Sequence, residues 1–178
     1  MASVPPASQS AGEALVSSIE SGAIAIHTDV RNLDFDKMTS IPNNGTRVIE
    51  IPISYIGSRY SNIRAVVNNR NRVIDYAEAH FTERSPDHGH AAVWSNGKPV
   101  LDRDLFASGD RIVRRGVGDA LTELNACLSS AGIPAWLIAG VMAACRTVIG
   151  PGLAACLIAG GVGAATAAFC QGRAISKL

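Results

Sequence analysis

Charged side chains almost disappear from this chain after Arg115. Residues 1–115 contain 13 Lys and Arg and 13 Asp and Glu, whereas residues 116–178 contain only 3 and 2. All four cysteines lie in the second segment, whose apolar residues are mainly Ala, Gly, Val, Ile and Leu. A single uniform fold does not account for such a division. We therefore predict a polar module first, and then an apolar helical segment from Gly116 to the end.

Several functional classes are disfavoured by composition and motif. The net charge of +1 and an isoelectric point of about 7.7 give no electrostatic case for nucleic-acid binding. The sequence has no glycine-rich phosphate loop, no nucleophile elbow and no paired carboxylates in a plausible cleft, so we predict neither an enzyme nor a cofactor. His80 and the turn segment Asp87–His90 do not supply the converging ligands of a metal site, and no metal is predicted.

The first 46 residues are predicted to be a flexible start with one short helix. Residues 1–11 are rich in Pro, Ser and Ala and have the composition of a disordered terminus. The helix is expected at Gly12–Ile26. Residues 27–46 contain the turn-forming Asn43-Asn44-Gly45 and are expected to be a loop.

From Arg47 the sequence changes to the alternation that is typical of β-strands. The first such run, RVIEIPI, contains Pro52, which suggests a position at the edge of a sheet. Turns are expected at Asn68–Asn71 and Ser85–Gly89. Asn96-Gly97 is the strongest hairpin signal, because both residues tolerate the positive φ of a type I′ turn.

These strands predict an antiparallel meander of four or five strands over residues 47–102. The helix at Gly12–Ile26 is the nearby element that can cover one of its faces. Residues 103–115 are expected to be a charged connector, which completes a β module over residues 47–115. The residues expected on the buried face are Ala65, Val67, Val73, Ala77, Phe81 and Val93.

The segment 116–178 is predicted to form three helices. They are expected at about residues 117–130, 135–149 and 153–171, separated by Gly132-Ile-Pro134 and Gly150-Pro151. The third helix carries Gly152, Cys156, Gly160, Ala164 and Ala168 at a spacing of four. One helix face is therefore made of small residues and permits close packing.

The same segment suggests contact with a membrane. The third helix spans roughly 27 Å at ~1.5 Å per residue, slightly less than the ~30 Å hydrocarbon core of a bilayer. The alternative is a buried hairpin in a soluble helical bundle. The residues expected to insert are Trp136, Leu137, Ile138, Arg146, Leu153, Leu157, Ile158, Gly160, Val162 and Phe169.

The positions of the cysteines fit an up-down-up arrangement of the three helices. Such an arrangement brings Cys127 close to Cys170 and Cys145 close to Cys156, and these are the disulfides that we predict among three possible connectivities. The alternative is four free, buried cysteines that act as small apolar residues. The expected fold class is α+β, with a small antiparallel sheet and one helix followed by a disulfide-linked apolar three-helix hairpin bundle.

The boundary between the two segments contains a candidate processing site. Arg114-Arg115 immediately precedes Gly116, and cleavage there releases a peptide with every cysteine. The alternative is a solvated charge pair in a linker. The first residues show no signal peptide, whereas an even number of cysteines favours an oxidising, extracellular destination. We expect a secreted product and leave the export route open.

The two segments together resemble the precursors of halocin-type and related Gram-positive bacteriocins. The front module runs from RVIEIPI to GKPVLDRDL, and the Cys-, Gly- and Ala-rich peptide runs from GVGDALTELNAC to AAFCQGRAISKL. The resemblance implies a secreted antibacterial peptide that permeabilises a target cell membrane and is able to oligomerise there. It also implies that the pro-region serves as an immunity or masking segment.

Two other functions are compatible with the sequence. The first is a two-span membrane protein of holin or anchor type, with residues 1–115 as its soluble domain. Free thiols and stable membrane residence of the intact chain would favour it. The second is a soluble ligand-binding module, in which the sheet encloses a small molecule and the tail packs on the sheet. A closed polar pocket in the sheet would favour that function.

Overall fold

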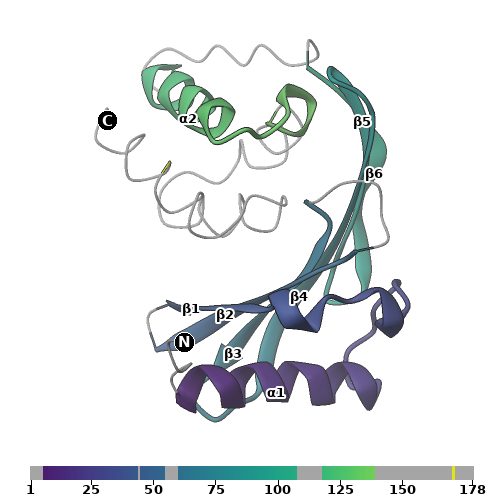
Figure 1. The fold of residues 1–178 in the computed structure, drawn as a ribbon, viewed down its shortest axis with the longest axis vertical. Coiled ribbons are helices and arrows are strands. Elements are labelled where there is room, and N and C mark those ends of the chain that lie inside the picture. Colours follow the sequence, from purple (N-terminus) through teal and green to yellow (C-terminus); the bar gives the residue numbers. More distant parts are fainter. Residues whose placement is uncertain (1–5, 44, 55–59, 108–117, 139–169, 171–178) are drawn as a thin grey trace. The chain divides into compact units, whose positions relative to one another are not determined.

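A computed structural model of the chain describes residues 6–43, 45–54, 60–107, 118–138 and 170 (Figure 1). The chain divides into two compact units, which do not follow the order of the sequence. The first unit contains residues 1–80 and 92–101, and the second contains residues 81–91 and 102–178.

The described strands form one six-stranded sheet in the order β1-β2-β3-β4-β5-β6 (Figure 1). The antiparallel meander predicted from the sequence is therefore confirmed, with more strands than the four or five expected. The strands are β1 Thr39–Asn43, β2 Thr46–Pro52, β3 Asn62–Asn68, β4 Val73–Ser85, β5 His88–Ser95 and β6 Lys98–Phe106.

Strand β1 corrects the prediction of a loop over residues 27–46. It pairs antiparallel with β2, from Thr39 opposite Glu50 to Asn43 opposite Thr46. Two short 3₁₀ turns, Val30–Asn32 and Phe35–Lys37, precede it. Strand β1 contains Pro42 and lies at the edge of the sheet. Proline is tolerated in an edge strand because its missing N–H removes no ladder hydrogen bond when that side of the strand faces away from the sheet.

The edge position predicted for Pro52 is wrong, since β2 lies between β1 and β3. Pro52 is the last residue of β2 and pairs with Asn62 of β3, whereas the pairing with β1 ends at Glu50. Beyond the end of β1, the segment around Leu33 lies beside this part of the chain, with an antiparallel bridge between Leu33 and Ile53. The carbonyl of Pro52 accepts a hydrogen bond from the Asp34 amide at 2.9 Å.

The hairpin turns follow the sequence signals closely. Asn96 and Gly97 have φ of 49° and 75° between β5 and β6, as a type I′ turn requires. Asn71, in the turn before β4, has φ of 54°. The turn between β4 and β5 is confined to residues 86–87. Strand β6 continues to Phe106, so the connector predicted from residue 103 is wrong over its first four residues.

Helix α1 spans Pro6–Glu20, earlier than the predicted Gly12–Ile26. The disordered start predicted for residues 1–11 is therefore wrong from Pro6 onward. The helix ends where Gly22 adopts a φ of 71° and donates its N–H to the Ile19 carbonyl at 3.0 Å. This left-handed conformation ends a helix and is accessible to glycine.

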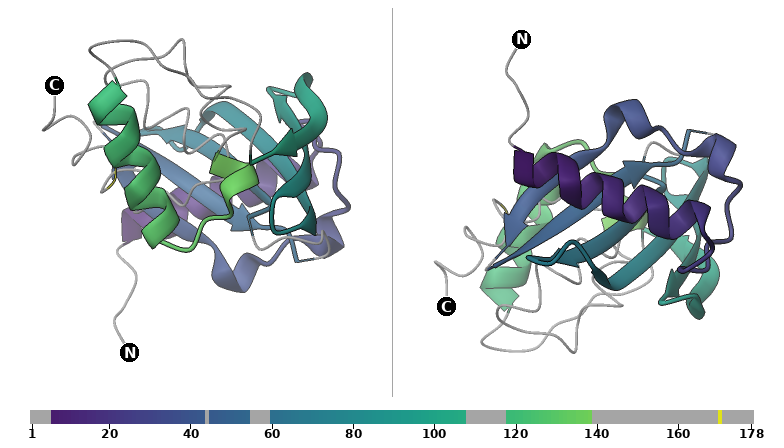
Figure 2. Two further views of the ribbon diagram at one scale, coloured as in Figure 1. Left: turned by 90° about the horizontal axis from the view of Figure 1, so that it is seen from above. Right: turned by 90° about the horizontal axis from the view of Figure 1, so that it is seen from below.

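The core of the first unit lies between α1 and one face of the sheet (Figure 2). Ala11, Leu15 and Ile19 recur every four residues and are buried along one side of α1. Opposite them lie the apolar residues of the inner strands, together with residues from the connecting segments. These are Ile24, Leu33, Ile49, Ile51, Ile53, Ile63, Ala65 and Val67.

The single buried face predicted for the sheet is wrong. Ala65 and Val67 are buried against α1, and Ala65 pairs with Tyr76. Side chains of directly paired residues share a face, so Ala77, the next residue along β4, points to the opposite face. Ala77 and Val73 are only half-buried, whereas Phe81 and Val93 are buried.

In the second unit, helix α2 spans Gly118–Ser130, as the sequence predicts. Gly132 ends this segment with a φ of 76°, and the Ile133 amide donates to the Leu128 carbonyl at 3.2 Å. A helical turn begins at Ala135, the predicted start of the second helix. The rest of that helix, and nearly all of the third, lie outside the described residues.

Within the described ranges, none of the helices has both the length and the apolar character needed to cross a membrane.

Candidate functional site

Three of the residues predicted to insert into a membrane are buried in the second unit. Trp136 and Leu137 are 0% exposed and Ile138 is 2% exposed. Trp136 is also the largest of the fully buried side chains. In the intact chain these residues are therefore covered, and contact with a bilayer requires that they first be uncovered.

The Trp136 ring packs against the end of the β4–β5 hairpin. A Cβ atom on Gly89 would lie 2.5 Å from Cε3, 2.6 Å from Cδ2 and 2.6 Å from Cζ3 of the indole. The Phe81 ring lies at a centroid distance of 6.4 Å and is tilted by 54°. We call Phe81 and Gly89 the tryptophan seat. Glycine is needed there because the indole occupies the space that any side chain would take.

A disulfide joins Cys127 at the end of α2 to Cys170, with Cα atoms 5.5 Å apart. It is one of the two bonds that the sequence predicts. It spans 43 residues of the apolar segment, and closure of such a loop contributes about 4 kcal/mol in the chain-entropy model. Cys145 and Cys156 lie outside the described residues, so their bond stays a prediction.

The remaining predicted site residues also lie outside the described part of the chain. They include the processing site Arg114, Arg115 and Gly116. The others are the expected membrane-inserting residues Arg146, Leu153, Leu157, Ile158, Gly160, Val162 and Phe169.

Histidines and aspartates gather across β5 and β6 near the seat. The Nδ1 atom of His90 lies 3.0 Å from Asp104 Oδ1, and its Nε2 lies 3.0 Å from Asp102 Oδ1. The His88 ring stacks on Phe106 at 4.3 Å and 10°. Its Nε2 is 3.7 Å from Asp104 Oδ2, which is too long for a hydrogen bond.

Asp104 is the centre of this group of charges. Hydrogen bonding from His90 holds the pKa of its carboxyl below the ordinary value. Desolvation acts in the opposite direction, and the nearby charge of Arg84, whose Nη2 lies 3.5 Å from Asp104 Oδ1, adds to the lowering. The carboxylate is therefore ionised throughout the mildly acidic and neutral range.

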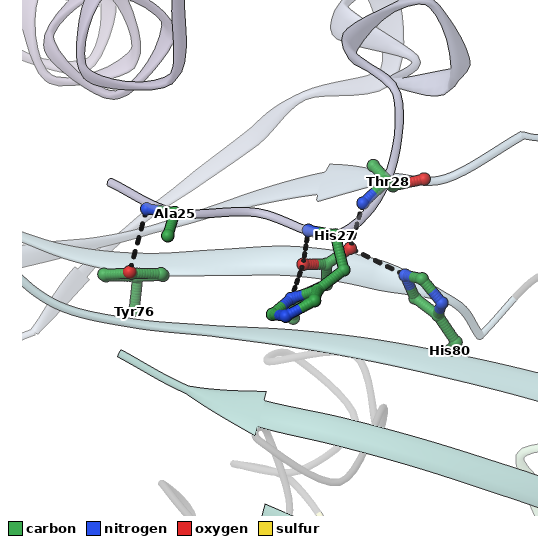
Figure 3. Close-up of polar contacts among 6 residues, drawn as sticks. Ala25, His27, Thr28, Tyr76 and His80 are labelled. Carbon is green, nitrogen blue, oxygen red and sulfur yellow. Dashed lines mark hydrogen bonds and ion pairs between the residues drawn. The ribbon is translucent and has the colours of Figure 1, made fainter. Parts of the chain in front are cut away.

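A second histidine–carboxylate group lies in the first unit, around Glu78 of β4 (Figure 3). Glu78 is 1% exposed. Its Oε2 accepts the His27 amide at 2.6 Å and faces His27 Nδ1 at 3.2 Å. Its Oε1 accepts the Thr28 amide at 2.7 Å and lies 2.6 Å from His80 Nε2. Four donors thus satisfy one buried carboxylate.

These contacts decide the charge of Glu78. Burial by itself would raise the pKa of this carboxyl, but hydrogen bonds from His80 and from the His27 backbone outweigh it and lower the pKa. Trp94 covers the group, stacked on His27 at 4.3 Å and edge-on to His80 at 4.9 Å. The group fastens residues 27–28 to β4, beside the bond from the Ala25 amide to the Tyr76 hydroxyl at 3.0 Å.

Among the residues that the structure describes, no group of three or more His, Cys, Asp or Glu is arranged to hold a metal ion.

The sequence reasoning missed the tryptophan seat and both histidine–carboxylate groups. The sequence does contain part of the signal for the two histidine–carboxylate groups, because each of them includes polar residues that are two positions apart within a strand. Such residues share one face of a strand. These pairs are Glu78 with His80, His88 with His90, and Asp102 with Asp104. Which pairs meet across strands depends on the register, and the sequence does not specify it.

Comparison with models of protein families, with curated proteins and with solved structures finds no match to this chain. The function is therefore proposed from the sequence and from the described contacts.

Proposed function

We propose that the chain is the precursor of a secreted antibacterial peptide, a bacteriocin, whose C-terminal region 116–178 permeabilises a target membrane. In this proposal the β module holds the apolar peptide in a covered state until release. The chain has no catalytic role and no nucleic-acid partner. Its partners are the target cell membrane and its own pro-region, which acts as a masking or immunity segment.

The observation that carries the proposal is the burial of Trp136 under the tryptophan seat. Trp136, Leu137 and Ile138 are among the most apolar residues of the described tail, yet they are almost fully removed from solvent. An aromatic side chain of this size has a strong tendency to enter the interface of a bilayer. Covering it with Gly89 and Phe81 keeps the intact chain from binding membranes.

The disulfide supports the same proposal. A bond between Cys127 and Cys170 lies entirely within the segment that cleavage at Arg115 would release. It therefore holds the two ends of the released peptide together after the pro-region is lost. We propose that a second bond, Cys145–Cys156, completes a three-helix hairpin bundle.

The experiment that tests the proposal compares the released peptide with the intact chain. Oxidised peptide 116–178 is expected to release dye from protein-free liposomes at micromolar concentration, and the intact chain to release little. Ala159→Arg in the peptide is the control, because a charge at mid-membrane depth costs ~2.5–3.5 kcal/mol on insertion scales. It is expected to abolish leakage.

Processing is tested in the producing cell. The mature peptide is expected to begin at Gly116, and a variant with both Arg114→Ala and Arg115→Ala is expected to accumulate as the full-length chain. Peptide 116–178 that binds no liposomes and causes no leakage would contradict direct permeabilisation. Stable membrane residence of the intact chain with free thiols would instead favour a two-span membrane protein.

A further inference from the structure

The indole N–H of Trp136 is a buried donor without a partner. Its Nε1 atom is enclosed by protein, and no residue that the structure describes accepts a hydrogen bond from it. A buried tryptophan usually places this N–H against an acceptor, because a desolvated donor that makes no hydrogen bond costs free energy. Here the orphan donor belongs to the largest of the fully buried side chains, so it requires a physical explanation.

The composition of the tryptophan seat explains why the donor has no acceptor there. The indole carbons nearest to the Gly89 position are Cε3, Cδ2 and Cζ3. All three belong to the six-membered ring, and none of them is bonded to Nε1. Phe81 contributes a hydrocarbon ring, and glycine has no side chain. The seat therefore contacts the hydrocarbon part of the indole, and neither of its residues has a side-chain nitrogen or oxygen that could meet the N–H.

The fold does supply partners to a buried polar group elsewhere. Glu78 in the first unit is 1% exposed, and its carboxylate faces four donors. Such complete pairing stabilises one arrangement of the chain and makes it costly to leave. The covered arrangement of Trp136 lacks this stabilisation, because its polar atom gains nothing from the contacts that bury it.

We propose that the tryptophan seat is an incomplete site, which holds the hydrocarbon of the Trp136 ring and weakens its own hold by leaving the N–H unpaired. Uncovering gives this donor a partner, first in water and then at the polar interface of a bilayer, where indole rings are enriched. The meaning of this step for membrane attack rests on the proposed function. The unpaired donor is a property of the intact chain alone.

The two parts of the indole thus act in opposite directions on the covered state. Burial of the ring removes a large apolar area from water and stabilises that state. Loss of water from the N–H destabilises the same state, because nothing replaces the lost hydrogen bond. The hydrocarbon effect prevails, since the side chain is 0% exposed, but the donor reduces its margin. A ring of the same shape without a donor should therefore be held more tightly.

The test removes the donor and keeps the outline of the ring. Benzothienylalanine has a sulfur atom in place of the indole N–H, and it is introduced at position 136 of the intact chain during translation. Opening of this segment is followed by amide hydrogen exchange at Leu137 and Ile138. Their backbone N–H groups donate to the Pro134 carbonyl at 3.0 and 3.1 Å, and both side chains are buried beside Trp136 in the sequence.

We expect both amides to exchange about 5- to 150-fold more slowly in the analogue than in the natural chain. This range is the ~1–3 kcal/mol penalty of one unpaired buried donor, converted at ~1.4 kcal/mol per factor of ten. The same analogue at Trp94 is the matched control. The Trp94 residue is half-buried, and its N–H is not among the described buried atoms that lack a partner. No slowing at Leu137 or Ile138 is expected from this control.

Exchange that is equal or faster with the analogue at position 136 would overturn the proposal, and so would equal slowing by the analogue at Trp94. If the benzothienylalanine chain does not fold, naphthylalanine at position 136 provides a second fused ring without an N–H, and the same slowing is expected. The measurement needs no membrane, so its outcome is independent of dye release. Slower exchange together with an inactive peptide 116–178 would retain the incomplete site and refute the antibacterial function. Leakage by the peptide with unchanged exchange would do the reverse.

Discussion

Replacement of Gly89 by alanine is expected to uncover Trp136 in the intact chain. Gly89 is not among the described residues with a positive φ, so its backbone accommodates alanine without strain. The change therefore adds one methyl group and alters little else. That methyl would lie 2.5 to 2.6 Å from three carbons of the indole, well inside van der Waals contact.

The energetic cost of the added methyl group depends on whether the atoms that it would overlap can move. The three carbons belong to a rigid ring system that is 0% exposed, and the ring also meets Phe81 on the hairpin. Inserting a methyl into a packed core typically costs ~1–3 kcal/mol. If this cost falls on the covered state, the uncovered population rises about 5- to 150-fold at ~1.4 kcal/mol per factor of ten.

Gly12→Ala is the matched control. A Cβ on Gly12 would lie 2.5 Å from Met38 Cε and 3.2 Å from Sδ, so the initial overlap is as severe as at Gly89. These atoms are the end of an adaptable side chain, which can change rotamer. Gly12 also lies within α1, where alanine is favoured over glycine by ~0.5–1 kcal/mol. No loss of Trp136 protection is expected.

The assay combines exchange of the Trp136 indole N–H with dye release by the intact chains. Gly89→Ala is expected to lower the protection factor and to raise leakage towards that of the free peptide, and Gly12→Ala to do neither. Equal protection in Gly89→Ala and the natural chain would refute the role of the seat. Lower protection without leakage would retain the seat and count against membrane permeabilisation.

Two further predictions concern the remaining bond and the buried carboxylate. Peptide mapping under non-reducing conditions is expected to link Cys145 to Cys156, and a link from Cys145 to Cys127 would contradict the up-down-up arrangement. Glu78→Gln is expected to lower the free energy of unfolding by ~1–3 kcal/mol, because the amide's N–H₂ must face donors that the carboxylate accepts. Since the pKa of Glu78 is lowered, its contribution is present above its ordinary pKa and is lost as the pH falls through the folded value. The variant's denaturant midpoint should therefore depend less on pH in the acidic range.

The parts of the fold that the sequence predicted are those set by local geometry. Asn96-Gly97 specifies its turn because few residues adopt two successive positive φ values. The stop of α2 at Gly132 follows for the same reason. Strand β1 escaped prediction because Pro42 and the Asn-rich turn after it have the composition of a loop. An edge strand accepts such residues, and its position at the edge is decided by pairing with β2.

The candidate site depends on contacts between residues far apart in the sequence. Gly89 looked like a turn residue in Ser85–Gly89, and nothing near it indicates that an indole from the tail fills the space above it. Likewise His90 was considered only as a member of a weak metal-binding pattern. Its partners are on β6, and only the folded hairpin brings both carboxylates within 3.0 Å of its ring.

The position of the tryptophan seat implies that cleavage after Arg115 and release of the C-terminal peptide are two separate steps. Phe81 and Gly89 precede Arg115 and Trp136 follows it, yet all three belong to one compact unit. A cut after Arg115 breaks the chain but leaves the indole in contact with the hairpin, because no residue of that contact is removed. Cleavage therefore makes the peptide separable but does not by itself uncover it. Cleaved protein in which Trp136 still lies against the tryptophan seat should for this reason stay inactive towards membranes until the two fragments dissociate.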